Sequence, residues 1–287
     1  MNLSTSQASG PVAHESDLDD TGERMLPETT KSSVFWEHVY RYAFACRHVK
    51  GLNVLDIASG EGYGTNALAQ VAKSIVGVDI SQDAIEHAIR RYHLDFRLGG
   101  AESIPVADCS IDAAVSFETI EHVSAPEKLV IELFRVIPPE GMLIISTPNK
   151  NLSRREVTSN PFHCSELTIS EFTALLNPWF EIQEICSQGL PCISLDRFQK
   201  ALSPISSRFA FWLRMQIQSA LIRKTLPLCD DGSSACRQHI IVSIPHLPNP
   251  TSNGWNPYRI QPLRNTENGE PAYFVVIAKR RFARLTG

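Results

Sequence analysis

An alternation of two sequence patterns between residues 53 and 188 is the strongest constraint on the fold. Short runs rich in Val, Ile and Phe predict buried strands, and the stretches between them have helical periodicity. Because successive parallel strands need helical crossovers, the alternation predicts an α/β fold: a doubly wound, mostly parallel sheet with helices on both faces. The predicted strands are 53–57, 74–80, 95–100, 111–117, 142–148 and 180–188, with a seventh at 272–280.

Capping signals mark the starts of several predicted helices. Ser81 precedes a helix over 82–92, and a further helix is predicted over 33–49. Ser124 with Glu127, and Thr168 with Glu171, have the spacing of a capping box. The helix after Ser124 is expected to bury one stripe, made of Leu129, Val130, Leu133, Phe134 and Ile137.

Composition divides the 287 residues into a domain and two appendages. Residues 1–20 are polar and acidic, which predicts a disordered tail. Residues 21–188 and 271–287 form the predicted domain. Residues 189–270, with two helical stretches and a loop rich in Pro and Asn, are expected to be a helical insertion before the last strand that covers the substrate.

Charge and cysteine content exclude several classes of protein. The net charge of −4 and pI near 6.1 argue against a nucleic-acid partner. The chain begins with no signal-peptide pattern and has no transmembrane run, so a cytoplasmic location is expected. Cys229, Cys236 and His239 lie close together in the sequence, but a fourth ligand is missing nearby, and no metal site is predicted.

A glycine loop follows the first predicted strand. Gly60, Gly62 and Gly64 do not keep the G-x-G-x-x-G spacing of a dinucleotide site, because Thr65 stands at the third position. Asp56, at the strand end, would repel a pyrophosphate and attract a cationic amine, directly or through water, although it could also be a strand-end cap. Asp79, after the second strand, can accept hydrogen bonds from ribose hydroxyls. Amine, ribose and an adenine walled by "GGAES" describe S-adenosyl-L-methionine.

The motifs of the chain resemble those of the class I S-adenosylmethionine-dependent methyltransferases. The resemblance rests on "VLDIASGEGYGT", "IVGVDI", "FRLGGAESIPVADCSIDAAVSFETIEHV" and "VIPPEGMLIISTPN". It implies a Rossmann-like seven-stranded sheet whose last strand is antiparallel. "TGERMLPE", "EHVYRYAFA", "SFETIEH" and "NPFHCSEL" are similar to a bacterial subgroup associated with polysaccharide and glycoconjugate biosynthesis.

The resemblance implies a set of cofactor-binding residues. Gly100 stands where many members carry an acid, so the adenine amino group is expected to contact backbone or Glu102. Tyr63 and Phe117 either face the cofactor or belong to the core. The full expected set is Asp56, Ala58, Ser59, Gly60, Glu61, Gly62, Tyr63, Asp79, Ile80, Gly100, Ala101, Glu102, Phe117 and Glu118.

Two histidines are the candidate catalytic residues. A neutral imidazole at His122 or His163 could remove the proton of an acceptor hydroxyl. The alternatives are that His122 packs on the cofactor or caps the next helix, and that His163 anchors its loop. Glu121 is expected to face solvent. Arg24 and Arg41 either close over the cofactor or acceptor, or form surface salt bridges.

The sequence favours an enzyme that methylates a small-molecule hydroxyl on a sugar or glycoconjugate, including a lipid-linked glycan. The alternatives are a methyltransferase for a phenol, quinone precursor or other natural product, and a non-catalytic module that binds S-adenosyl-L-methionine. The apolar and basic segment 206–228 is read as a lid, as a membrane-surface contact or as a partner helix. The oligomeric state is left open.

Overall fold

The computed structural model describes residues 24–27, 30, 32–153, 162–188, 244–246, 260–263 and 271–282. Several predictions therefore lie outside the described residues. These are the tail 1–20, most of the insertion 189–270 with its segment 206–228, and the group Cys229, Cys236 and His239.

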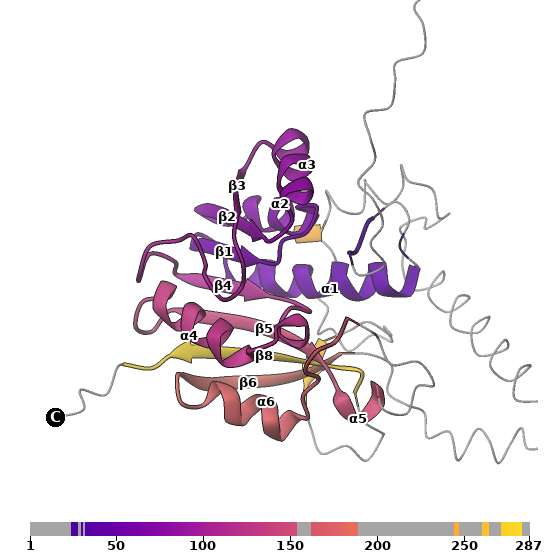
Figure 1. Cartoon of the computed structure of the whole chain (residues 1–287), viewed down its shortest axis with the longest axis vertical. Helices are drawn as coiled ribbons and strands as arrows, with labels where there is room; N and C mark the ends of the chain where they lie inside the picture. Colours follow the sequence, from indigo (N-terminus) through magenta and orange to yellow (C-terminus); the bar gives the residue numbers. More distant parts are fainter. Residues whose placement is uncertain are drawn as a thin grey trace, which may run out of the picture.

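A single mixed sheet forms the centre of the fold (Figure 1). Its strands are β1 (Asn53–Ile57), β2 (Ser74–Asp79), β3 (Asp95–Leu98), β4 (Ala113–Ser116), β5 (Met142–Pro148), β6 (Phe180–Gln188), β7 (Ile260–Pro262) and β8 (Tyr273–Arg280). The order across the sheet is β3-β2-β1-β4-β5-β8-β6-β7. Strands β1 to β5 pair in parallel, and β8 runs antiparallel to both β5 and β6. The predicted fold class, with its antiparallel last strand, is confirmed.

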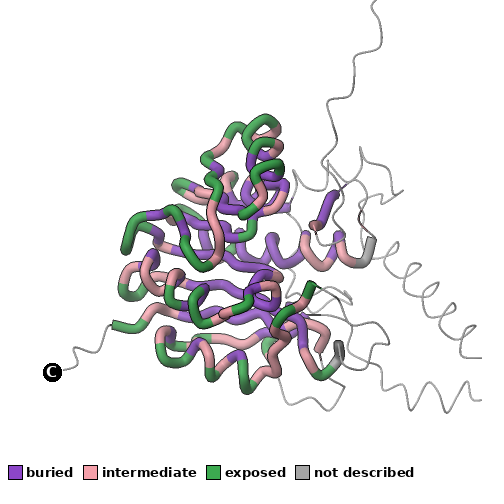
Figure 2. Tube along the Cα trace, in the orientation of Figure 1, coloured by how far each residue is buried: buried purple, intermediate pink, exposed green. Residues whose placement is uncertain are grey.

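Helices cover both faces of this sheet. They are α1 (Ser32–His48), α2 (Tyr63–Ala69), α3 (Gln82–Tyr92), α4 (Pro126–Val136), α5 (Lys150–Ser153) and α6 (Ile169–Leu176), with the 3-10 turns η1 (Ile120–His122) and η2 (Ile244–His246). Alternate strand residues face opposite sides. Val54 therefore packs with α1 and α2, whereas Leu55 and Ile57 pack with α4 and α6. The buried segments run along the strands in Figure 2.

The helix starts agree with the sequence at two of three sites. Ser81 caps α3 by accepting a hydrogen bond from Ala84 N, and the capping box of Thr168 and Glu171 is present. The predicted box at Ser124 is wrong, because Ala125 is the N-cap and makes no side-chain cap hydrogen bond. Pro126 occupies the first turn of α4, where its fixed φ suits a helix start. Ser124 Oγ lies 3.4 Å from Glu102 Oε1 instead.

Two short described pieces of the predicted insertion belong to the core of the domain. β7 adds an eighth, edge strand that pairs with β6, which the sequence did not predict. Its three residues are too few to show a period-2 pattern. Ile244 in η2 is buried against α1. Among the described helices, none is both long and apolar enough to cross a membrane.

Candidate active site

A cavity of about 950 Å³ opens where the parallel strands end. Strands β1 and β4 are neighbours there, so the cavity lies at the switch point of the sheet, where open α/β folds bind ligands. The cavity is lined by α1, by the loops that follow β1 to β4, by His163 and Glu166, and by the start of β8. Eleven of the expected cofactor residues line it: Ala58, Ser59, Gly60, Tyr63, Asp79, Ile80, Gly100, Ala101, Glu102, Phe117 and Glu118.

The glycine loop is shaped by close packing on both of its sides. Gly60 and Gly62 have φ of 56° and 94°, in the left-handed region that favours glycine. A Cβ on Gly62 would lie 2.9 Å from Ala88 Cβ on α3, and one on Gly64 would lie 2.0 Å from Tyr42 Cζ on α1. Gly62 and Gly64 therefore let α3 and α1 approach the loop, and Gly60 is the loop glycine that lines the cavity.

Asp79 ties the loop to the end of β2. Its Oδ2 accepts a hydrogen bond from Gly60 N at 2.8 Å, and its Oδ1 accepts one from Ser81 N at 2.9 Å. A carboxylate offers about four acceptor positions, so further lone pairs remain on the oxygens of a residue that lines the cavity. Asp79 can thus accept ribose hydroxyls while it holds the loop.

Asp56 lies beneath the cavity and does not line it, which corrects the direct amine contact expected for it. Its carboxylate accepts hydrogen bonds from Thr65 Oγ1 at 2.7 Å and from Tyr42 OH at 3.1 and 3.3 Å. The reason is the strand period: Leu55 and Ile57 face α4, so Asp56 must face α1 and α2. Burial raises the pKa of Asp56 to about 7. Tyr42, which does line the cavity, separates Asp56 from a ligand.

We expect Asp56 to make the protein less stable as the pH rises from about 4 to about 7. The folded pKa of about 7 exceeds the unfolded value, about 3.9, so the folded state binds more protons between them. The free energy of unfolding should fall across this window by up to about 4 kcal/mol.

Urea unfolding at several pH values should show a smaller fall in Asp56→Asn, whose side chain does not ionise. The exposed control Asp83→Asn should keep the wild-type slope, and equal slopes in all three proteins would contradict the expectation.

Glu61 and Gly62 also lie away from the cavity. The Glu61 carboxylate accepts a hydrogen bond from Tyr92 OH at 3.1 Å and pairs with Arg91 and His87 at 3.4 and 3.3 Å. Its buried side chain therefore joins the loop to α3. Glu61 and Gly62 contact α3 and do not line the cavity, so in this structure they shape the loop. A cofactor role for either residue stays a prediction.

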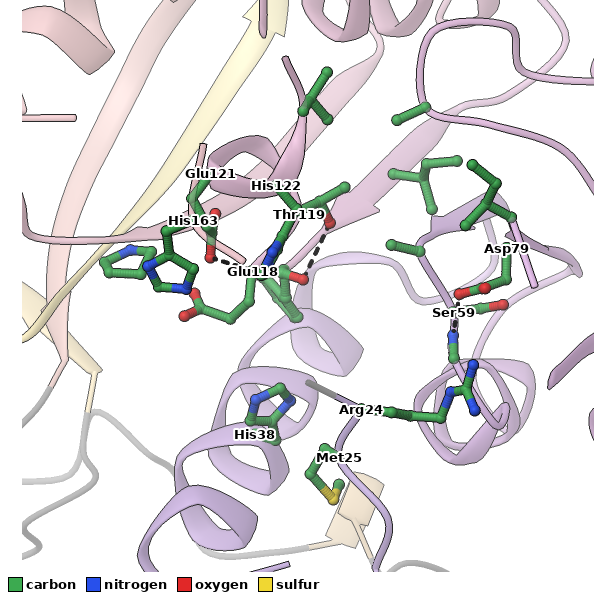
Figure 3. A pocket seen from close by; sticks show the side chains of 18 of the residues that line it. Arg24, Met25, His38, Ser59, Asp79, Glu118, Thr119, Glu121, His122 and His163 are labelled. Atoms are coloured by element: carbon green, nitrogen blue, oxygen red, sulfur yellow. Dashed lines mark hydrogen bonds and ion pairs between the residues drawn. The ribbon is translucent and has the colours of Figure 1, made fainter. Parts of the chain in front are cut away.

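The two candidate histidines meet at one side of the cavity. Their rings are 5.0 Å apart in an edge-to-face arrangement, and both line the cavity (Figure 3). Cys164 N and Ser165 N donate to the main-chain oxygen of Glu121 at 2.7 and 3.0 Å, which fixes the loop carrying His163 beside η1. Asp79 and Ser59 lie at the opposite side of Figure 3, with Glu118 and Thr119 between the two groups.

Glu121 is fully buried, so the expectation that it faces solvent is wrong. The 3-10 turn η1 carries its side chain inward, where Oε2 accepts from Thr147 Oγ1 at 3.4 Å. Burial, with the nearby charge of Glu118, raises the pKa of Glu121 well above its usual value. Glu118 lies just after the end of β4 and lines the cavity. Its φ is 48°, an unusual conformation for a residue with a side chain.

Arg41 fulfils neither of its two expected roles. Its side chain is 1% exposed and does not line the cavity. Nη1 donates to Gln188 Oε1 at 3.0 Å and lies 3.6 Å from Glu118 Oε1, and the guanidinium stacks over Tyr273 at 4.6 Å. Arg41 therefore pairs with Glu118, a cavity residue, without lining the cavity itself. Arg24 does line the cavity.

His38 is a cavity residue that the sequence analysis missed. It lies on α1, where the helical pattern offers no sign that one side faces a ligand. Its Nδ1 is 2.9 Å from Tyr63 OH, and burial with the nearby Arg41 charge lowers its pKa well below the usual value. His38 is therefore neutral at pH 7 and adds a third imidazole to the lining.

The residues at the Asp79 side fit a nucleoside ligand. Ser59 Oγ is buried and lacks a hydrogen-bond partner among the described residues, so it is available to a bound group. Ile80 is 81% exposed beside Gly100 and Ala101, and together they offer an apolar wall for a ring. Glu102 lines the same region, although Lys128 Nζ lies 3.0 Å from its Oε2.

Comparisons with known proteins agree with this arrangement. Residues 55–145 match the family described as a methyltransferase domain. A protein of Mycolicibacterium smegmatis named as an S-adenosylmethionine-dependent methyltransferase is 36% identical over 169 residues, which are 57% of this chain and 66% of the relative. Residues 55–145 therefore form a methyltransferase domain. The cofactor of this methyltransferase domain is S-adenosyl-L-methionine.

Two further similarities concern a relative and a fold. A ubiquinone biosynthesis O-methyltransferase of Rhizobium johnstonii is 23% identical over 66% of this chain and 79% of its own. A chain from the complex of the Haloferax volcanii Trm112 methyltransferase activator with a methyltransferase has a TM-score of 0.53 at 16% identity, covering 87% of this chain and 92% of that one. The second similarity shows the fold alone. The methyltransferase domain matches just under two thirds of the Mycolicibacterium relative's length.

Proposed function

We propose that the protein transfers a methyl group from S-adenosyl-L-methionine to a hydroxyl group of a small molecule, with a sugar or glycoconjugate as the acceptor. One observation carries the proposal. A single cavity joins a side suited to a nucleoside, around Asp79, to a side with two imidazoles, His122 and His163. A methyl donor and an acceptor can therefore lie in the same cavity.

The chemistry requires positioning and one proton acceptor. S-adenosyl-L-methionine, when bound, supplies a methyl group on a positively charged sulfur. The chain must hold the acceptor oxygen in line with that group, exclude water and receive the hydroxyl proton. His122 Nδ1 faces Phe162 O at 3.2 Å and His163 Nδ1 faces Glu166 Oε1 at 2.8 Å. Both acceptors require a proton on Nδ1, so each neutral ring has its lone pair on Nε2.

The polar lining of the acceptor side supports a sugar. Beyond the histidines, hydroxyl and carboxylate groups surround this side of the cavity, from Glu118, Thr119, Ser124 and Glu166. A polyhydroxylated acceptor can exchange hydrogen bonds with such groups. Binding sites that hydrogen-bond substrate hydroxyls discriminate strongly against analogues that lack them.

A quinone precursor or another phenol is the second candidate acceptor. The similarity to the ubiquinone biosynthesis O-methyltransferase of Rhizobium johnstonii favours it. Met25, Tyr42 and Phe117 supply apolar lining that could contact an aromatic ring. The proposed partner of the domain is thus a small molecule in either case, and no nucleic-acid partner is proposed.

Methyl transfer to a panel of nucleotide sugars, glycans and phenols tests these proposals. We expect the highest kcat/KM with a sugar, and a fall in kcat of about 10²- to 10⁴-fold in the double variant His122→Gln/His163→Gln, because the proton acceptors are lost. The variant should bind S-adenosyl-L-methionine as the wild type does. Tight cofactor binding without transfer to any acceptor would favour a non-catalytic module, and a phenol preferred over every sugar would favour the second candidate. Full activity of the double variant would exclude both histidines from the reaction.

A further inference from the structure

Three side chains with metal-binding chemistry converge at the acceptor side of the cavity. Glu121, His122 and His163 each offer one ligand atom, and these atoms lie within 4.8 Å of one another. We propose that Glu121, His122 and His163 bind a divalent transition-metal ion of the zinc type, which engages the acceptor hydroxyl. The part of this inference that concerns the hydroxyl rests on the proposed function, whereas the metal site stands on the geometry alone.

The strongest support is an unpaired buried carboxylate oxygen. Glu121 Oε1 is buried and has no hydrogen-bond partner among the described residues, and His122 Nε2 lies 4.0 Å from it. A buried acceptor left without a partner costs free energy. Thr147 holds the other oxygen, Oε2, at 3.4 Å. A cation bound between Glu121 Oε1 and the two imidazoles would give this oxygen a partner without a change in its orientation.

Hydrogen bonds outside the cluster orient each of the three side chains. His122 Nδ1 donates to the main-chain oxygen of Phe162, and His163 Nδ1 donates to the Glu166 carboxylate. Histidines that bind metals are typically held in this way, with the second ring nitrogen donating to a carbonyl or carboxylate. The same bonds place the lone pair of each neutral ring on Nε2, the tautomer that can coordinate an ion.

The carboxyl groups near the cluster also suit a cation. Three carboxyl groups, those of Glu118, Glu121 and Glu166, gather around two imidazoles on this side of the cavity. Arg41 lies 3.6 Å from Glu118, but it is held by Gln188 beneath the cavity. These carboxyl groups would surround a bound cation with acceptor oxygens.

The ligand set selects the kind of metal. Two imidazoles and one carboxylate suit Zn²⁺ and similar transition metals, whereas Mg²⁺ and Ca²⁺ prefer oxygen ligands. Tetrahedral bonds of about 2.0 to 2.1 Å need ligand atoms about 3.3 Å apart, so atoms within 4.8 Å of one another must approach by up to about 1.5 Å. The two histidine side chains are partly exposed, which leaves them room to move.

Three protein ligands leave a coordination position for the acceptor. A metal ion lowers the pKa of a bound hydroxyl, as it does for water. The O–H bond then breaks with loss of the proton to solvent, and the new O–CH₃ bond forms as the S–CH₃ bond breaks. Charge balances, because the sulfonium becomes a neutral thioether when the deprotonated oxygen is methylated. With the ion bound, His122 and His163 would act as its ligands; without the ion, they remain the proton acceptors of the proposed function.

Titration of the metal-stripped full chain with Zn²⁺ and with Co²⁺ tests the site. Calorimetry should show one ion bound, and the Co²⁺ absorption spectrum should report nitrogen and oxygen ligands. Glu121→Gln and His163→Gln should each weaken binding by at least 10-fold, and Glu166→Ala should weaken it by about 10- to 100-fold because the His163 ring loses its orienting partner. Mg²⁺ should not compete.

Two control variants separate this site from other metal-binding groups. His93→Asn changes an exposed histidine at the C-cap of α3, and Cys229→Ser changes a thiol outside the described residues. Both variants should bind the ion as the wild type does. No binding by the wild type, or undiminished binding by both Glu121→Gln and His163→Gln, would overturn the inference. Methyl transfer that persists without metal would leave the proposed function intact and remove the role of the ion in it. Metal binding without methyl transfer to any acceptor would support the metal site and contradict the proposed function.

Discussion

Arg41→Ala is expected to lower the free energy of unfolding by about 3 to 5 kcal/mol, the largest effect on stability that we expect from one substitution. The guanidinium is 1% exposed, donates to Gln188 and lies beside the Glu118 carboxylate. Its removal leaves Glu118 without its nearby cation and opens a void against the Tyr273 ring. Urea unfolding measured by circular dichroism gives the change directly.

The exposed Arg47 on the same helix is the matched control for this variant. Arg47→Ala should change the free energy of unfolding by no more than about 0.5 kcal/mol, as surface substitutions usually do. The double variant Arg41→Ala/Glu118→Gln should lose less free energy of unfolding than the two single variants lose together, because the uncompensated charge of Glu118 is then absent. Additive losses would show that Arg41 acts through packing and not through its charge on Glu118.

Asp79→Ala is expected to weaken the binding of S-adenosyl-L-methionine by about 10²- to 10⁴-fold. The substitution removes an acceptor for two ribose hydroxyls, and each hydrogen bond to a charged group is worth about 1.5 to 3 kcal/mol. It also releases Gly60 N and Ser81 N, which hold the loop and the start of α3 at the cavity. Calorimetry with the cofactor measures the loss.

Asp79→Asn should give a smaller loss, because one acceptor oxygen remains. Asp83→Asn, an exposed acid in the first turn of α3, should bind the cofactor as the wild type does. Unchanged affinity in Asp79→Ala would remove Asp79 from the cofactor site. Affinity lost equally in all three variants would point to a general effect of charge near α3.

Most of the sheet and its helices could be predicted, because each element has a local pattern. The bounds of β1, α3, β5 and β6 agree with those predicted from periodicity and caps. The Asp79 side of the cavity could be predicted for a similar reason. Its residues follow strand ends directly, and parallel strands bring their ends to one edge.

The sequence could not show on which side of the loop each residue lies. Asp56, Glu61 and Gly62 stand within the predicted cofactor motif, yet they contact α1, α2 and α3 instead of the cavity. For Arg41 the sequence allows closure over a ligand or a surface salt bridge, but its side chain is buried and donates to Gln188, which lies 147 residues further along the chain. Such long-range contacts have no local signature.

The sequence by itself determined the α/β architecture, the methyltransferase resemblance and the carboxylate at Asp79, since strand period, capping and motif spacing are local properties. Only the tertiary structure decided that Glu121 is buried and that His163 lies against His122. The two histidines are 41 residues apart, and main-chain hydrogen bonds from Cys164 and Ser165 to Glu121 bring them together. Whether separate polar residues form one site depends on that packing, which the order of residues does not reveal.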